Sequence, residues 1–95
     1  MSAIDELFQR LKAEGKKAFM PFVTAGDPSL EFTAAILQRL DAEWCHLAEL
    51  GIPYSDPIAD GPVIQDSYTR SLQGGTKLNG IFSMASEVTA EISMP

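Results

Sequence analysis

Apolar residues recur every three or four positions in three parts of the chain, which is the period of an α-helix with one buried face. The three segments are residues 2–14, about 28–42 and 77–92. A fourth helix is expected over residues 62–72, because Pro62 suits the first turn of a helix and Gly74-Gly75 interrupts one. The side chains expected to be buried on the periodic helices are Ile4, Leu7, Phe8 and Leu11; Phe32, Ala35, Ile36 and Leu40; and Leu78, Ile81, Phe82, Ala85, Val88 and Ile92.

Polar residues and glycines indicate where these helices begin and end. Asp27 is expected to cap the second helix, with Pro28 at its first position, and Thr76 to cap the last. Gly15 is expected to end the first helix, because the residue after a last turn commonly adopts the left-handed conformation that glycine tolerates.

Two short apolar segments between the helices, residues 17–24 and 44–50, are predicted to be β-strands. The first is almost continuously apolar, which is typical of a strand covered on both faces in a parallel sheet. Pro21 has no backbone N–H, so we expect a bulge or a local loss of pairing there. The alternation of strands and helices predicts parallel strands joined by right-handed crossovers.

Two parallel strands make a poor domain by themselves, because their outer edges stay unpaired and one face lacks full cover. A closed (βα)8, or TIM, barrel takes about eight strand–helix units and roughly 250 residues. We therefore expect residues 1–95 to form a single partial α/β domain: an N-terminal helix and two βα units of a barrel, truncated before a third strand. Self-association into a homo-oligomer is expected to complete it.

Composition and charge narrow the functional classes. The formal net charge of −6, with the basic residues dispersed, opposes binding to nucleic acid. One histidine and one cysteine, adjacent at positions 46 and 45, lack the spacing of a metal site, and no glycine-rich nucleotide motif is present. We therefore expect neither a metal nor a cofactor.

The chain carries no sequence sign of export or membrane insertion. Its apolar runs, such as residues 18–23, are too short to cross a bilayer, and its N-terminus lacks the pattern of a signal peptide. A single cysteine forms no intramolecular disulfide, which agrees with a reducing compartment. We expect a cytoplasmic protein with no membrane partner.

Two carboxylates are the strongest candidates for chemistry. Glu49 falls at the carboxyl end of the second predicted strand, and Asp60 follows eleven positions later in a loop rich in proline and glycine. In a barrel this edge carries the catalytic groups, and two carboxylates there divide the roles of proton donor and anion. The rival interpretation is a solvated acidic loop, because Asp is also a common turn residue.

The segments FMPFVTAGDP at residues 19–28 and ELGIPYSDPIADGP at residues 49–62 resemble the α subunit of tryptophan synthase. The resemblance implies a barrel enzyme that cleaves indole-3-glycerol phosphate to indole and glyceraldehyde 3-phosphate. It implies that Glu49 is the general acid/base that protonates the indole carbon bearing the side chain. Asp60 would accept a hydrogen bond from the indole N–H, and Phe22 would pack against the indole ring.

The same resemblance implies a protein partner. The loop with Pro53, Asp56 and Pro57 matches the segment that faces the β subunit of tryptophan synthase. The resemblance covers the whole chain but only about the first third of a family member, so the phosphate site and most of the indole pocket would be missing. We therefore expect the isolated chain to be inactive. Two other functions stay open: a self-assembling barrel fragment, and a module that only binds the β subunit.

Trp44 departs from the family pattern. Before the second strand the family usually reads Ala-Gly-Ala-Asp, with glycine at the position of Trp44. A bulky ring there is unexpected if the position requires a positive φ. This departure and the short length are consistent with a truncated or engineered chain.

Overall fold

The computed structural model describes residues 2–56 and 59–95, and within them it contains four helices and two strands. In chain order these are α1 (Ala3–Ala13), β1 (Phe22–Thr24), α2 (Leu30–Ala42), β2 (Glu49–Gly51), α3 (Pro62–Gln73) and α4 (Leu78–Thr89). The strands pair in parallel in a two-stranded sheet. The predicted α/β class and order of elements are confirmed.

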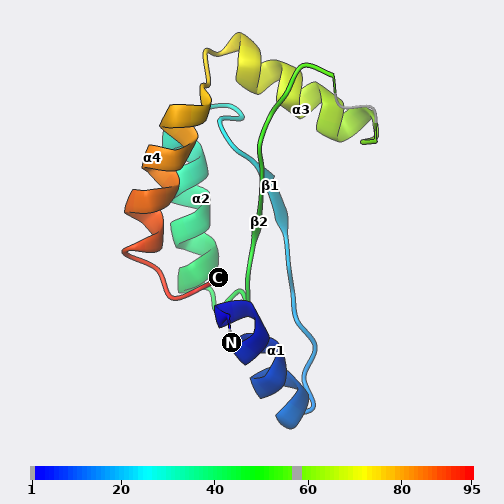
Figure 1. Cartoon of the computed structure of the whole chain (residues 1–95), viewed down its shortest axis with the longest axis vertical. Coiled ribbons are helices and arrows are strands. Elements are labelled where there is room, and N and C mark those ends of the chain that lie inside the picture. The colour runs from blue at the N-terminus through cyan, green and yellow to red at the C-terminus, as the bar shows by residue number, and fades with distance from the viewer. Residues whose placement is uncertain (1, 57–58) are drawn as a thin grey trace.

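The elements are arranged around the strand pair at the centre of the molecule (Figure 1). α2 and α4 pack side by side, and residues of β2 contact the apolar cluster between them. α3 crosses the carboxyl ends of the strands, and α1 lies at their amino ends. None of the helices in the described ranges is long and apolar enough to span a bilayer.

Both strands are shorter than predicted. β1 begins at Phe22 rather than at residue 17, because Pro21 lacks the N–H that would continue the ladder. The expected local loss of pairing at Pro21 is confirmed by this late start of β1, although the Pro21 carbonyl still accepts the Glu49 N–H at 2.9 Å. β2 begins at Glu49 rather than at residue 44, because Trp44 and Cys45 complete the C-terminus of α2 instead.

The predicted cap of α2 is wrong. Ser29 is the N-cap, since its Oγ accepts the Phe32 N–H at 3.1 Å, and Leu30 rather than Pro28 is the first helical residue. Asp27 lies two positions too early for this contact.

The predicted boundaries of α4 are also wrong. Lys77, not Thr76, takes the N-cap position, and the helix ends at Thr89 rather than near Ile92. Thr76 belongs to the end of α3, because its N–H donates to the Ser71 carbonyl at 3.2 Å.

Three helices are each followed, after the last turn, by a residue in the left-handed backbone conformation. The φ angle is +70° at Gly15 after α1, +64° at Trp44 after α2 and +89° at Gly75 after α3. The next N–H bonds back to a carbonyl five residues earlier in each case: Lys16 to Leu11 at 2.9 Å, Cys45 to Leu40 at 3.0 Å and Thr76 to Ser71 at 3.2 Å. Trp44 therefore stands where glycine is favoured, and its side chain is 88% exposed.

Replacing Trp44 by glycine is expected to stabilise the chain by about 0.5–1 kcal/mol. The left-handed conformation costs a residue with a Cβ about 1–2 kcal/mol, and glycine's greater freedom in the unfolded chain offsets part of that gain. Urea unfolding followed by far-UV circular dichroism measures the change, because Trp44 is the only tryptophan. Trp44→Ala, which keeps a Cβ, should show no such gain; equal gains in both variants would mean that the backbone is not the source of the strain.

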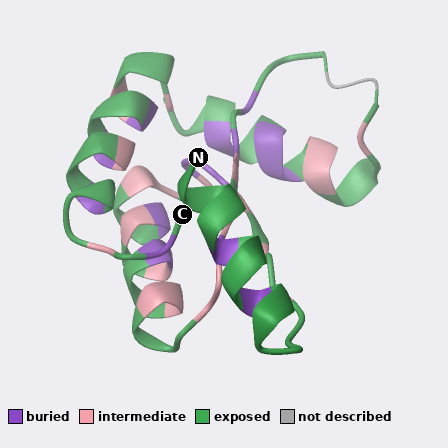
Figure 2. Cartoon of the chain, turned by 60° about the horizontal axis from the view of Figure 1, so that its bottom comes forward, coloured by how far each residue is buried: buried purple, intermediate pink, exposed green. Residues whose placement is uncertain are grey.

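The core consists of two clusters (Figure 2). The first joins α1 to the segments that precede β2 and follow α4, and contains Leu7, Leu11, Leu47 and Met94. The second lies between α2, α4 and the sheet, and contains Leu37, Met84 and Val88, with Leu50 packed against them.

The apolar periodicity predicted the positions of the helices correctly, but it predicted their buried side chains only in part. Leu7, Leu11, Ile81 and Val88 are buried as expected. The expected core side chains that are instead exposed are Ile4, Phe8, Phe32, Ala35, Leu78 and Phe82, whereas Ile36, Leu40, Ala85 and Ile92 are half-buried. Each helix thus carries a wider apolar face than the described residues cover.

On α2 the buried positions are Thr33 and Leu37, neither of which was predicted. Thr33 tolerates complete burial because its hydroxyl donates to the Ser29 carbonyl at 2.9 Å and accepts the Gly26 N–H at 3.0 Å.

The expectation that β1 is covered on both faces is wrong within the described residues. Phe22 is 41% exposed and its strand partner Glu49 is also exposed, whereas Val23 and Leu50 are half-buried. One face of the sheet therefore packs against α2 and α4 through Leu50. The other face is covered by α3 at Thr24 and leaves Phe22 and Glu49 exposed.

Candidate active site

The parallel pairing of β1 and β2 brings Phe22 and Glu49 side by side. The register pairs Phe22 with Glu49 and Thr24 with Gly51, and paired residues of parallel strands project from the same face. Glu49 was predicted at the carboxyl end of a strand over residues 44–50, but it is the first residue of β2, which runs on to Gly51. Among the described residues the Glu49 carboxylate has no hydrogen-bond or ion-pair partner. An aromatic ring and an available carboxylate therefore share this open face.

Gly51 allows the Phe22 ring to lie across the end of β2. A Cβ added at Gly51 would overlap the carbon atoms of that ring, so only glycine permits this close approach. Sequence reasoning did not assign Gly51 a role. The glycine directly after the Glu49-Leu50 pair, at the end of a strand, is the signal that could have found it.

Asp60 lies in a group with two tyrosines. It is half-buried, and its carbonyl accepts a hydrogen bond from Gln65 Nε2 at 2.6 Å. Burial and, secondarily, the negative charge of Asp60 raise the pKa of the Tyr68 hydroxyl. The Tyr68 ring packs against that of Tyr54, with 5.4 Å between ring centroids and 50° between planes. The structure thus pairs Phe22 with Glu49, whereas Asp60 lies in the segment before α3, where its charge acts on Tyr68.

Hydroxyl groups fix α3 on the end of β1. Thr24 Oγ1 and Ser67 Oγ lie 2.7 Å apart, and Ser71 Oγ donates to the Ala25 carbonyl at 2.7 Å. Ser67 and Ser71 are four residues apart, so they share one face of the helix. Both are buried, and their hydrogen bonds offset the cost of removing them from water.

An ion pair reinforces this contact. Arg70 on α3 donates from Nε and Nη2 to the two carboxylate oxygens of Asp27, at 3.0 and 2.9 Å. The hydrogen bond to Asp27 raises the pKa of the Arg70 guanidinium, which stays charged. Asp27, predicted to be a helix cap, instead ties the loop after β1 to α3. These contacts hold the helix that follows Asp60.

The predicted partner loop is described only in part. Pro53 is buried at the end of β2, and Asp56 is exposed. Pro57 lies outside the described residues.

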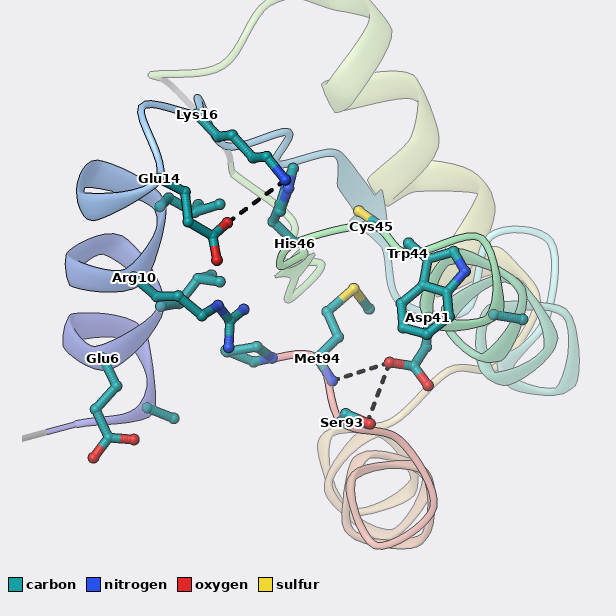
Figure 3. A pocket seen from close by; sticks show the side chains of 15 residues that line it. Glu6, Arg10, Glu14, Lys16, Asp41, Trp44, Cys45, His46, Ser93 and Met94 are labelled. Carbon is teal, nitrogen blue, oxygen red and sulfur yellow. Dashed lines mark hydrogen bonds and ion pairs between the residues drawn. The ribbon is translucent and has the colours of Figure 1, made fainter.

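A large open cleft lies at the amino ends of the strands, away from Phe22 and Glu49 (Figure 3). It has a volume of about 760 Å³ and lies between α1, the end of α2, the segment before β2 and residues 93–95. Its charged lining consists of Glu6, Arg10, Glu14, Lys16 and Asp41, with His46 beside them. None of the predicted site residues within the described ranges lines this cleft.

The part of the chain that the structure describes contains no cluster of metal-ligating side chains. No group of three or more histidine, cysteine, aspartate or glutamate side chains there is placed to hold an ion. The residues of the candidate site are carboxylates, an aromatic ring and tyrosines.

Known proteins match this chain along nearly its whole length. The family model for the tryptophan synthase alpha chain matches residues 8–95. The tryptophan synthase alpha chain of Acaryochloris marina is 50% identical over 95 residues, which are all of this chain and 36% of that protein. The chain thus spans about a third of the length of the curated relatives it matches.

Solved structures share the fold. The crystal structure of tryptophan synthase subunit alpha from Legionella pneumophila matches with a TM-score of 0.93 at 36% identity, over 100% of this chain and 37% of that one. A tryptophan synthase complex from Pyrococcus furiosus matches with a TM-score of 0.77 at 45% identity, over 82% of this chain and 32% of that one. The two parallel strands with flanking helices are therefore part of a TIM barrel, and this chain belongs to the tryptophan synthase alpha chain family.

Proposed function

We propose that this chain provides the first two βα units of a barrel that cleaves indole-3-glycerol phosphate to indole and glyceraldehyde 3-phosphate. The observation that carries the proposal is the pairing of Phe22 with Glu49 on the open face of the sheet. An indole ring lying against Phe22 would meet the Glu49 carboxyl group. No metal or cofactor takes part in this proposal.

The proposed chemistry follows from the need to make indole a leaving group. Glu49 protonates the indole carbon that bears the glycerol phosphate side chain, which weakens the carbon–carbon bond to that side chain. The ring then carries positive charge, and Asp60 stabilises it by accepting a hydrogen bond from the indole N–H. As the carbon–carbon bond breaks, its electron pair returns to the indole ring and neutralises the positive charge. The Glu49 carboxylate, which has given up its proton, takes up the proton of the side-chain hydroxyl as the aldehyde forms.

We also propose that the 95-residue chain alone does not catalyse the reaction. In barrels the phosphate site is built from late βα loops, and this chain spans 36% of its Acaryochloris marina relative. Positioning of the substrate supplies much of the rate in such enzymes, so Glu49 without a phosphate anchor has little effect.

Joining this chain to the part of the Acaryochloris marina protein that follows the matched segment tests the proposal. The fused barrel is expected to release indole from indole-3-glycerol phosphate, and the isolated chain is expected to release none above background. A folded fused barrel without activity would overturn the assignment, and activity of the isolated chain would overturn the requirement for the remaining units.

A second candidate, self-association, is favoured by the exposed apolar surface. Phe19, Met20, Phe22 and Ile52 are 61%, 47%, 41% and 38% exposed on or beside the strands. Each strand has only the other as a partner in the described residues, so both outer edges offer unpaired backbone groups. We propose that the isolated chain forms a homo-oligomer that covers these edges.

Light scattering and urea unfolding over a range of concentrations test self-association. The solution mass is expected to exceed the 10.3 kDa of one chain, and the unfolding midpoint to rise with concentration. A folded monomer with a concentration-independent midpoint would contradict it, and would mean that two βα units close their own core.

For the complete barrel we propose a β subunit as the protein partner. The support is the membership of the family and the match to the Pyrococcus furiosus tryptophan synthase complex. The loop after β2, with exposed Asp56 beyond the buried Pro53, is the proposed contact. As a step of amino-acid biosynthesis, the activity is proposed to be cytoplasmic.

A further inference from the structure

Two side chains hold the backbone of Phe19 before the strand ladder begins. The Phe19 N–H donates to His46 Nδ1 at 2.8 Å. The Phe19 carbonyl lies 3.6 Å from Cys45 Sγ, which makes a weak hydrogen bond at most. Pro21 interrupts the backbone ladder directly after this point, so side chains from the neighbouring segment replace the missing backbone partners.

The Phe19–His46 contact continues the register of the sheet. The two residue numbers differ by 27, the same offset as in the pairs Phe22–Glu49 and Thr24–Gly51. The backbone bonds from Glu49 to Pro21 and from Ala25 to Gly51, both 2.9 Å, follow farther along the same strand pair. The hydrogen bond from the Phe19 N–H to the His46 side chain therefore extends the pairing of the two segments at the amino end of the strands.

We propose that His46 is a positioning residue that holds the Phe19 end of the strand pair in the register of β1 and β2 only while its imidazole is neutral. Neutral imidazole has one acceptor nitrogen, and here Nδ1 fills that role, which places the hydrogen on Nε2. Protonated imidazole is a donor at both nitrogens, so Nδ1 would then face the Phe19 N–H with a hydrogen of its own.

The groups around His46 come from three elements (Figure 3). α1 and the turn after it contribute Glu6, Arg10, Glu14 and Lys16, α2 contributes Asp41, and the segment before β2 contributes Cys45. Lys16 pairs with Glu14 at 3.6 Å, and Asp41 accepts the Ser93 and Met94 N–H groups at 3.2 and 3.1 Å. Three of these charged groups, Glu14, Lys16 and Asp41, thus have other partners. Comparing the exchange of the Phe19 amide with that of a reference amide separates the His46 contact from the electrostatic effect of the remaining charges.

Hydrogen exchange of the Phe19 amide in the full chain tests the proposal. The Ala25 amide, whose acceptor is the Gly51 carbonyl, is the reference, because that bond does not titrate. After correction for intrinsic exchange rates, the protection of Phe19 relative to Ala25 is expected to fall about tenfold between about pH 8 and about pH 5.

Two variants isolate the acceptor. In His46→Asn the Oδ1 acceptor lies as many bonds from the Cβ as Nδ1 does and does not titrate, so Phe19 should stay protected at both pH values. In His46→Leu no acceptor remains, so protection should be low at both. If His46→Leu fails to fold, the protection of the Phe19 amide in His46→Asn at the two pH values tests the proposal alone.

The proposal is overturned if His46→Asn loses protection with pH as the wild-type chain does. It is equally overturned if the wild-type Phe19 amide is unprotected at about pH 8, or if His46→Leu keeps the protection.

Discussion

Glu49→Gln in the fused barrel is expected to lower kcat for indole release by at least about a hundredfold, the usual contribution of a general acid/base. Glutamine fills almost the same volume beside Phe22 but cannot deliver a proton to the indole carbon. KM should change little, because binding depends mainly on the aromatic contact and the phosphate site. Steady-state kinetics of indole release measures both values.

The matched control for this variant is Glu31→Gln, which neutralises an exposed carboxylate on α2 far from the sheet face. It should leave kcat unchanged. A loss of less than about threefold in Glu49→Gln would show that Glu49 is not the acid, since removing a proton donor costs far more.

Leu37→Ala is expected to destabilise the chain by about 2–4 kcal/mol. Leu37 is 7% exposed and packs against Met84 and Val88, so its removal leaves a cavity between α2 and α4. A loss of this size is a large part of the stability of a small domain. Urea unfolding measures it.

Phe32→Ala, on the same helix, is the control and should cost less than about 1 kcal/mol, because Phe32 is 47% exposed. The apolar pattern alone predicts the opposite order, with Phe32 in the core. A greater loss from Phe32→Ala than from Leu37→Ala would mean that α2 turns a different face to the sheet.

The sequence predicted the order of the elements because three helices carry an apolar period and because Pro62 and Gly74-Gly75 mark the limits of the fourth. The sequence did not predict where the helices begin and end, because single hydrogen bonds determine these boundaries. Ser29 caps α2 through one hydrogen bond to the Phe32 N–H, and neighbouring Asp27 offers the same chemistry two residues too early. Trp44 extends the C-terminus of α2 into what was expected to be a strand.

The buried faces could not be read from periodicity, because α2 carries apolar residues around much of its circumference. Which of them is buried depends on how α2 docks against α4, a contact between distant segments. Thr33, completely buried, was missed because its hydroxyl is satisfied by Ser29 and Gly26, and a pattern of apolar residues does not report such bonds.

For the site, the resemblance supplied Phe22, Glu49 and Asp60, and the structure adds the register that sets Phe22 against Glu49. That register depends on pairing between segments 27 residues apart, which local sequence does not encode. His46, considered in the sequence only as a metal ligand, accepts the Phe19 N–H through its side chain.

The most direct test of the central claim is a crystal structure of the fused barrel with a non-cleavable indolylpropyl phosphate. Our account predicts that the indole ring lies against Phe22, with the Glu49 carboxyl group within hydrogen-bond distance of the ring carbon that bears the side chain, and with Asp60 accepting the indole N–H. An indole ring bound in the cleft at the amino ends of the strands, among Arg10, Lys16 and His46, would contradict it.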